Sequence, residues 1–261
     1  RNLTAIKGQL ERLLDFAEGP CQALLVDNRD WTEPVGVLEF LRDVGKHVTV
    51  NTMLAKESVK ARVNSPNGIS YTEFSYMLLQ ANDFRYLNDE LGVELQVGGS
   101  DQWGNITAGI DLTRRVNGRH THGLTVPLVT RADGQKFGKS AEGAVWLSAE
   151  KTTPYAFYQY FVNVDDRDVE RFLLQLTLLP VSRVVEVVAE HVLSPQRRHA
   201  QRVLAREVTA LVHGATEASR AAGASQDFTR GAAELTALEW EALATSLPVV
   251  ELDGAALAAD L

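Results

Sequence analysis

A strand, a glycine-rich turn, a helix and a further strand follow one another in the middle of the chain, and this order constrains the fold more than any other feature. The four segments are 95–97, 98–101, 106–115 and 124–129. Strands that alternate with helices usually form a parallel sheet, with binding sites at the carboxyl ends of the strands. The sequence therefore predicts an α/β domain with a site at the glycine-rich turn.

Further elements are expected on the N-terminal side of this unit. Apolar residues recur at helical spacing over 2–16, and the short apolar run at 23–26 is typical of a buried strand. Helices are also expected near 36–44 and 51–63. These segments extend the predicted α/β domain toward the start of the chain.

A capping box is expected at the start of a long helix. Ser70 and Glu73 have the required spacing, at which each side chain bonds the other residue's backbone amide. A helix is therefore predicted from Tyr71 to about Glu90.

The pattern changes near 145–155. From Pro154 onward nearly every segment has the periodicity of a helix. The chain is therefore expected to contain two domains, an α/β domain at 1–148 and an all-helical domain at 149–261.

Two helices of the second domain are marked by their ends. Asp165 and Asp166 fit a helix start, where carboxylates meet the positive end of the helix dipole. Ser194 as N-cap, Pro195 at the first helical position and Gly214 after the last residue frame another helix.

The composition is that of an ordinary globular protein. Of 261 residues, 45% are hydrophobic and 23% are charged, and the net charge is −8. Disorder and membrane insertion are poor interpretations of these values. The acidic balance argues mildly against nonspecific polyanion binding but does not exclude nucleic acid, because a local basic face can act inside an acidic protein. The single cysteine, Cys21, and the absence of a signal-peptide pattern predict a cytoplasmic protein that does not bind membranes.

The predicted helix from Tyr71 carries a polar stripe. Tyr76, Gln80 and Asp83 lie at i, i+4 and i+7, within an arc of roughly 60°. A solvated outer face is one interpretation. A phenol, an amide and a carboxylate are also a donor and acceptor set suited to a small polar ligand.

The glycine-rich turn suits a nucleotide. Glycines where a strand turns into a helix let a ligand approach the main chain, and the first helical amides favour anions. An acidic side chain such as Asp101 can bond ribose hydroxyls. The alternative interpretation is a tight structural turn.

The segment 133–140 brings two lysines into a glycine-containing stretch. Gly138-Lys139-Ser140 resembles the end of a P-loop, but Asp133 stands where that motif needs glycine. A loop with two ammonium groups, Lys136 and Lys139, is useful where negative charge builds up during nucleotidyl transfer. A solvated charged loop is the alternative.

Basic residues gather in two places, where each is a candidate phosphate contact or an ordinary surface charge. They are Arg114 and Arg115 at the end of one helix, and Arg197, Arg198 and Arg202 on the helix expected from Pro195. His120 and His122 lack carboxylate or cysteine neighbours, so no metal site is assigned.

Three segments, in this order, resemble the bacterial-type tyrosyl-tRNA synthetases, which are class I aminoacyl-tRNA synthetases. They are 71–81 (YTEFSYMLLQA), 98–105 (GGSDQWGN) and 136–140 (KFGKS), the family's form of the class I lysine loop. The similarity covers almost the whole chain, including 40–47 and 165–169. It implies a Rossmann-like parallel sheet, incomplete at its N-terminus, in a catalytic domain at 1–148, and a helical tRNA (anticodon)-binding domain at 149–261.

The resemblance also implies a tyrosine site. Tyr76 and Gln80 would hold the ammonium group of the amino acid, and Asp83 would bond its phenolic hydroxyl. Asn28 would be a further residue of this pocket, at the substrate end of the site.

The same resemblance implies an ATP site. Gly99 and Asp101 would meet the ribose, and Gln102 would orient the carboxylate that attacks the α-phosphate. Lys136, Lys139 and Ser140 would close over the leaving pyrophosphate. The implied reaction is tyrosine plus Mg·ATP giving tyrosyl-adenylate, followed by transfer to tRNA(Tyr).

Members of this family are homodimers, with Tyr71 resembling a position at the subunit contact. They also carry an N-terminal His-x-Gly-His element and a C-terminal S4-like domain, which this sequence does not show. The chain is therefore expected to be a fragment with weak or no activity by itself. A noncatalytic RNA-binding or dimer-forming module and a related nucleotidyltransferase are the alternatives.

Overall fold

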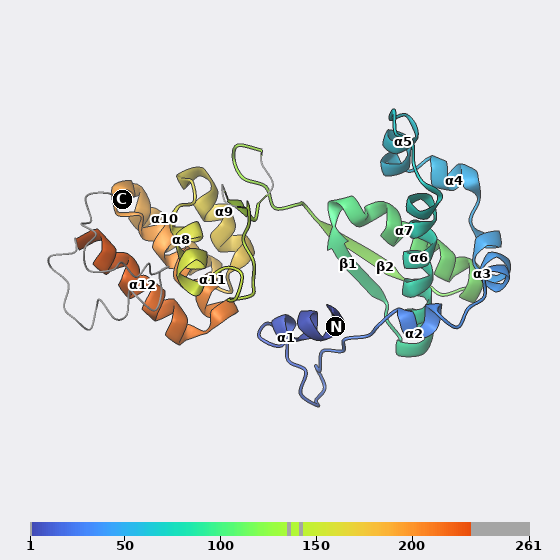
Figure 1. The fold of residues 1–261 in the computed structure, drawn as a ribbon, viewed down its shortest axis with the longest axis horizontal. Helices are drawn as coiled ribbons and strands as arrows, with labels where there is room; N and C mark the ends of the chain where they lie inside the picture. The colour runs from blue at the N-terminus through green and yellow to red at the C-terminus, as the bar shows by residue number, and fades with distance from the viewer. Residues whose placement is uncertain (1, 135–136, 141–142, 231–261) are drawn as a thin grey trace, which may run out of the picture. The chain divides into compact units, whose positions relative to one another are not determined.

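The computed structural model describes residues 2–134, 137–140 and 143–230 (Figure 1). The chain divides into two compact units. One unit is Val26–Val129, and the other joins Arg1–Leu25 to the chain from Thr130 onward. The predicted functional boundary between 148 and 149 stays a prediction.

The unit at 26–129 contains a parallel strand pair and several helices. Its elements are α2 (Arg29–Thr32), α3 (Val37–Asp43), η1 (Gly45–His47), α4 (Val50–Leu54), α5 (Glu57–Val63), α6 (Tyr71–Leu91), β1 (Leu95–Gly99), η2 (Ser100–Gln102), α7 (Trp103–Asn117) and β2 (His122–Val126). β1 and β2 pair in parallel, in register from Leu95 opposite His122 to Gly99 opposite Val126. The predicted strand, turn, helix, strand order and the α/β class are thus confirmed.

Helix α7 packs on β1 and β2 with one side and on α6 with another. Two glycines make these contacts close. A Cβ atom at Gly109 would lie 2.9 Å from Cδ1 of Phe84 on α6, and one at Gly123 on β2 would lie 2.6 Å from Cγ2 of Ile106. Residues of α4, α6 and α7, among them Met53, Met77 and Leu112, form the adjoining buried cluster.

The capping box at the start of α6 is present as predicted. The Ser70 hydroxyl accepts from the backbone N–H of Glu73 at 3.2 Å, and the Ser70 backbone N–H donates to the Glu73 carboxylate at 3.1 Å. The helix ends at Gly92, whose φ of 67° is the left-handed conformation that favours glycine.

The other unit is built mainly of helices. Its described elements are α1 (Asn2–Leu10), β3 (Lys139–Ser140), β4 (Gly143–Ala144), α8 (Pro154–Val162), α9 (Asp166–Leu176), α10 (Val181–Leu193), η3 (Pro195–Arg197), α11 (His199–His213) and α12 (Ala215–Arg230). α11 packs against α8, α9, α10 and α12, and Leu204 and Ala205 at its centre are fully buried. The predicted all-helical pattern after Pro154 is confirmed for the residues described.

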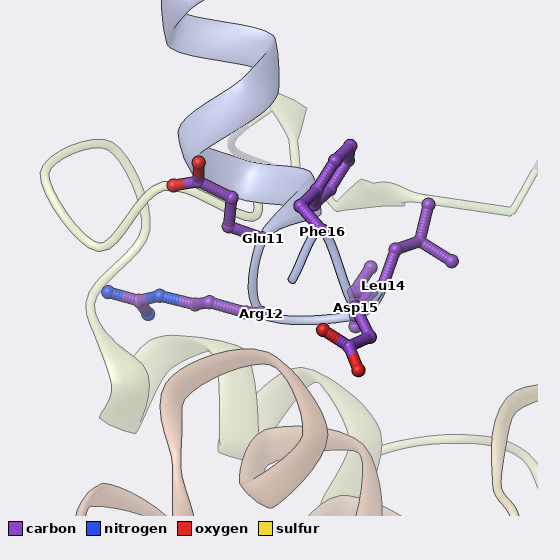
Figure 2. A pocket seen from close by; sticks show the side chains of 6 residues that line it. Glu11, Arg12, Leu14, Asp15 and Phe16 are labelled. Carbon is purple, nitrogen blue, oxygen red and sulfur yellow. The ribbon is translucent and has the colours of Figure 1, made fainter. Parts of the chain in front are cut away.

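An arginine near the start of the chain meets the end of α11. Glu11, Arg12, Leu13, Leu14, Asp15 and Phe16 line a shallow pocket in the turn after α1. Figure 2 shows Arg12 leaving this turn away from Leu14 and Asp15. Its guanidinium donates to the Val212 carbonyl at 3.0 Å, so a cation complements the negative end of the α11 dipole.

The strand predicted at 23–26 is wrong. Leu24 and Val26 are 66% and 42% exposed, and β1 and β2 pair with each other but not with this segment. An apolar run becomes a buried strand only where a neighbouring strand supplies hydrogen-bond partners for its backbone. No such neighbour lies beside 23–26 in the described chain.

Two helix predictions differ at their boundaries. The helix expected at 2–16 ends at Leu10, and the Asp15 carboxylate instead accepts from the Ala17 amide, a local bond that competes with helix. The helix expected at 51–63 is two helices, because Lys56 is extended.

Ser194 and Pro195 do not start a long helix, contrary to prediction. Ser194 makes no capping bond, and Pro195 begins a 3-10 turn instead. Arg198, with φ of 51°, separates this turn from α11. By contrast, Gly214 caps the end of α11 and Asp165 caps α9, both as predicted.

Loss of the α6 capping box is expected to destabilise the fold. Ser70→Ala leaves the Glu73 amide without its acceptor and should lower the free energy of unfolding by about 1 kcal/mol. Ser75→Ala, one turn further along, is the matched control, because that hydroxyl bonds only the Thr72 carbonyl. Urea unfolding measures both variants. Equal stability of the two would contradict the assigned role of Ser70.

His213 is expected to make the helical unit acid-sensitive. Its ring lies edge-on to Phe157 at 4.9 Å, and among the described residues neither ring nitrogen has a hydrogen-bond partner. Burial, followed by the positive charge of Arg12, lowers its pKa below the ordinary 6.5, against an opposing effect of Glu217. The neutral ring is thus favoured in the folded state.

This stabilisation is complete above about pH 6.5 and is lost as the pH falls through the lowered pKa of His213. The free energy of unfolding should therefore decline less between pH 7 and pH 5 in His213→Gln than in the unchanged protein. His120→Gln is the control, because His120 is exposed. Chemical unfolding at several pH values measures the difference, and parallel profiles for all three proteins would refute it.

Candidate functional site

The polar stripe of α6 is separated from the buried side of the helix. Tyr76 is 56% exposed, and Gln80 and Asp83 are half-buried. Ala81 and Phe84 are 0% and 1% exposed and pack into the core. The helix thus presents a phenol, an amide and a carboxylate along one side while its apolar residues anchor it.

Asp83 is held by two donors from α2 and the residue before it. The Asn28 amide donates to Oδ2 at 3.1 Å, and the Trp31 indole N–H donates to Oδ1 at 2.8 Å. Trp31 also stacks on Tyr86, with ring centroids 4.6 Å apart and planes at 14°. The structure therefore brings Asn28 and Asp83 together, although more than fifty residues separate them in sequence.

Sequence reasoning missed Trp31. The residue lies three positions after Asn28, which places both on one side of a helical turn. This spacing of three positions is the sequence signal from which Trp31 could have been found. A donor from each residue leaves the Asp83 carboxylate fixed in orientation, with lone pairs remaining for a further donor.

The turn after β1 leaves no room for a side chain at Gly99. A Cβ atom at Gly99 would lie 2.7 Å from Oδ1 of Asp101 and 3.0 Å from Cδ2 of Leu128. Gly99 has φ of −72°, so glycine is needed here for space and not for backbone conformation. Asp101 is exposed and accepts from the Gln102 amide at 3.2 Å, while Asn105 donates to Gln102 at 3.2 Å.

The lysine loop belongs to the other compact unit. Lys136 lies outside the described residues. Lys139 and Ser140 form β3, paired antiparallel with Ala144 and Gly143 of β4. The convergence of these residues with Asp83 and Asp101 in one cleft stays a prediction.

The two predicted basic clusters differ in how their charges are used. Arg114 and Arg115 lie at the end of α7, where both pair with Asp111 at 3.0 and 3.4 Å. The Arg114 hydrogen bond is the main cause of the lowered pKa of Asp111. Arg115 also donates to the His47 carbonyl at 3.2 Å. Each arginine of this pair is therefore partly neutralised.

Arg197 and Arg198 do not lie on α11, contrary to prediction; Arg202 does. Arg198 donates to the Val162 carbonyl at 2.9 Å and to the Asn163 side chain at 3.0 Å, which ties the link before α11 to the end of α8. Arg197 and Arg202 have no carboxylate partner within the described chain. Their charges remain available to an anion.

All three arginines line one cavity of about 220 Å³ between α8, η3, α11 and α12. Its residues are Tyr155, Gln159, Val162, Asn163, Gln196, Arg197, Arg198, Arg202 and Ser225. The volume is below the roughly 300–1,000 Å³ typical of sites for drug-sized ligands. The positive charges of Arg197 and Arg202 at this cavity suit an anionic group such as a phosphate.

Comparison with known families identifies the group to which the chain belongs. Residues 1–230 match the family described as tRNA synthetases class I (W and Y). The chain therefore belongs to the class I tRNA synthetases of this group.

Two similar relatives are tyrosine–tRNA ligases. The chain is 55% identical to a tyrosine–tRNA ligase of Roseiflexus castenholzii, over 86% of this chain and 53% of the relative. It is 50% identical to that of Opitutus terrae, over 98% of this chain and 60% of the relative. The chain spans between half and two thirds of the length of these relatives.

Solved structures give the same result. A C-terminally truncated mitochondrial tyrosyl-tRNA synthetase of Coccidioides posadasii matches with a TM-score of 0.71 and 35% identity, over 82% of this chain and 64% of that one. The corresponding protein of Aspergillus nidulans matches with a TM-score of 0.69 and 30% identity, over 87% of this chain and 64% of that one.

Among the described helices, none is long and apolar enough to cross a membrane.

Proposed function

We propose that the protein is a tyrosine–tRNA ligase that forms tyrosyl-adenylate from tyrosine and Mg·ATP and transfers the tyrosyl group to tRNA(Tyr). The observation that carries the proposal is the arrangement around Asp83, whose carboxylate is oriented by Asn28 and Trp31 on the polar side of α6. Tyrosine is the amino acid whose side chain ends in a hydroxyl donor on an aromatic ring.

Asp83 supplies the selectivity in this proposal. A tyrosine hydroxyl donates to the remaining lone pair of the carboxylate. Phenylalanine displaces water from the Asp83 carboxylate but cannot donate a hydrogen bond to it. The desolvated carboxylate is then left without this partner. Gln80 and Tyr76, one and two turns earlier on α6, bind the ammonium group of the amino acid.

The glycine turn and the lysine loop bind ATP. Gly99 gives the nucleotide close access to the main chain, and Asp101 accepts hydrogen bonds from the ribose hydroxyls. Gln102 orients the tyrosine carboxylate. Lys136, Lys139 and Ser140 bind the pyrophosphate. The Mg²⁺ ion enters with ATP as part of the substrate, coordinated mainly by its phosphates.

The reaction requires that the protein position the two substrates and stabilise the charge on the leaving pyrophosphate. A carboxylate oxygen of tyrosine attacks the α-phosphorus, a P–O bond forms, and the bond to the β-phosphate oxygen breaks to release pyrophosphate. The lysine ammonium groups stabilise the charge that develops on the leaving group. Alignment of the two substrates lowers the barrier without any covalent bond to the protein.

The tRNA is bound by the helical domain and by Arg114 and Arg115. In the helical domain, Arg197 and Arg202 hold a phosphate at the mouth of the cavity, and Arg198 shapes its wall. The protein acts as a homodimer in the cytoplasm, with Tyr71, which is 75% exposed, at the subunit contact. The catalytic domain comprises 1–148 and the tRNA-binding domain 149–261.

Tyrosine-dependent exchange between pyrophosphate and ATP tests this function in the full-length protein. Exchange is expected with tyrosine and not with phenylalanine or tryptophan. The proposal fails if another amino acid alone supports the reaction.

Asp83→Asn should reduce kcat/KM for tyrosine by about 10- to 100-fold, because the substrate loses a hydrogen bond to a charged group. Any trace of exchange with phenylalanine should not fall, so the preference for tyrosine should shrink. Glu90→Gln, the same chemical change at an exposed position of α6, is the matched control and should leave both rates unchanged. An unaltered preference in Asp83→Asn would exclude this residue from the tyrosine site.

Arg197→Gln combined with Arg202→Gln should weaken tRNA binding and flatten its dependence on salt, by about one unit of slope for each phosphate that the variant no longer neutralises. Arg183→Gln is the control, because Arg183 is already paired with Glu186 at 2.8 Å. Filter binding at several salt concentrations gives the slopes. Identical slopes for the double variant and the control would remove the cavity from the tRNA site.

A further inference from the structure

An ion pair on α9, between the buried Asp168 and the half-buried Arg171, reaches the chain segment that leads into the lysine loop. Asp168 is 2% exposed, and its carboxylate accepts from the Ala132 backbone N–H at 2.8 Å. Arg171, one turn later, bonds the same carboxylate at 2.5 Å and also donates to the Thr130 carbonyl. Two side chains of one helix thus fix main-chain atoms on both sides of Arg131.

A second group of contacts holds the loop after residues 135–136. The Phe137 ring packs edge-on to Phe172 at 4.7 Å and to Tyr160 at 5.7 Å, and it lies 6.0 Å from Phe161. The Gly138 backbone N–H donates to the Tyr160 hydroxyl at 3.1 Å, and the Gly138 carbonyl accepts from Val145 at 2.9 Å. The residue directly before Lys139 is therefore bound to α8.

The burial of Asp168 makes these contacts stronger than those of an exposed surface ion pair. A carboxylate taken out of water is costly unless charge and hydrogen bonds compensate it, so Asp168 holds its partners firmly. Those partners are the Ala132 backbone N–H, far away in sequence, and Arg171, which itself donates to the Thr130 carbonyl. Because α8 and α9 belong to the same compact unit, the loop is tied at both flanks to one support.

We propose that Asp168, Arg171 and Tyr160 are positioning residues for adenylate formation: they fix the two flanks of the lysine loop, and thereby the backbone that carries Lys139. This inference rests on the proposed function. None of the three residues needs to touch the substrate. Their role is to remove freedom from the loop before the pyrophosphate departs.

The test compares Asp168→Asn, Tyr160→Phe and the control Glu186→Gln in the full-length protein. Glu186 is an exposed carboxylate on α10 that pairs with Arg183 and lies away from residues 130–140 in sequence. Active-site titration counts competent molecules, and the single-turnover rate of tyrosyl-adenylate formation is then expressed per site. A purely structural role lowers the number of sites, not the rate at each site.

Asp168→Asn should lower the rate per site by about 100-fold, the loss expected from a shift of about 1 Å in a reacting group. Tyr160→Phe, which removes one hydrogen bond, should lower it by about three- to ten-fold. The Kd of tyrosine should not change, because the tyrosine site does not use the loop. If Asp168→Asn fails to fold, Tyr160→Phe decides the outcome.

Trypsin cleavage after Lys136 and Lys139 gives a readout that needs no activity. Both variants should be cut faster than the control at these lysines and at the same rate elsewhere. An unchanged rate per site in both variants overturns the inference, whatever the cleavage shows. If the unchanged protein lacks tyrosine-dependent exchange, the proposed function fails. In that case, faster cleavage of the two variants supports only the anchoring of the loop by Asp168, Arg171 and Tyr160. Unchanged cleavage overturns the anchoring as well.

Discussion

The contact between Phe84 and Gly109 fixes the geometry on which the tyrosine site depends. Phe84 is 1% exposed and leaves no room for a side chain at Gly109, so α6 and α7 approach closely. Asp83, the preceding residue, is consequently turned toward α2. Because α7 begins directly after the glycine turn, the same contact also sets the distance between that turn and the polar stripe of α6.

Helix α8 gives the helical domain two kinds of surface. Tyr155 and Gln159 line the cavity that contains the arginines, whereas Tyr160 and Phe161 contact the residues of the lysine loop. A helix of nine residues cannot move one of these sides without moving the other. The proposed tRNA site and the support of the lysine loop therefore share one rigid element within the same unit.

Features set by neighbouring residues are predictable from the sequence, and features set by distant partners are not. The capping box of α6, the cap of α9 and the order of β1, α7 and β2 depend on local chemistry, and all are predicted correctly. The strand at 23–26 is wrong because its apolar run finds no ladder partner. Trp31 was missed because its hydrogen bond to Asp83 joins two residues that are 52 positions apart in the sequence. The roles of Lys136 and Lys139 rest on resemblance and stay predictions.

The strand pair that leads into the glycine turn is covered unequally on its two faces. Residues of β1 and β2 that point toward α7 are half-buried, whereas Leu95, Val97, Leu124 and Val126 on the opposite face are 49–58% exposed. Parallel sheets are normally covered on both faces. A layer on this second face would bury these side chains and restrain the end of β1. Because Gly99 is the last residue of β1, that layer would also steady the turn that the proposed reaction uses.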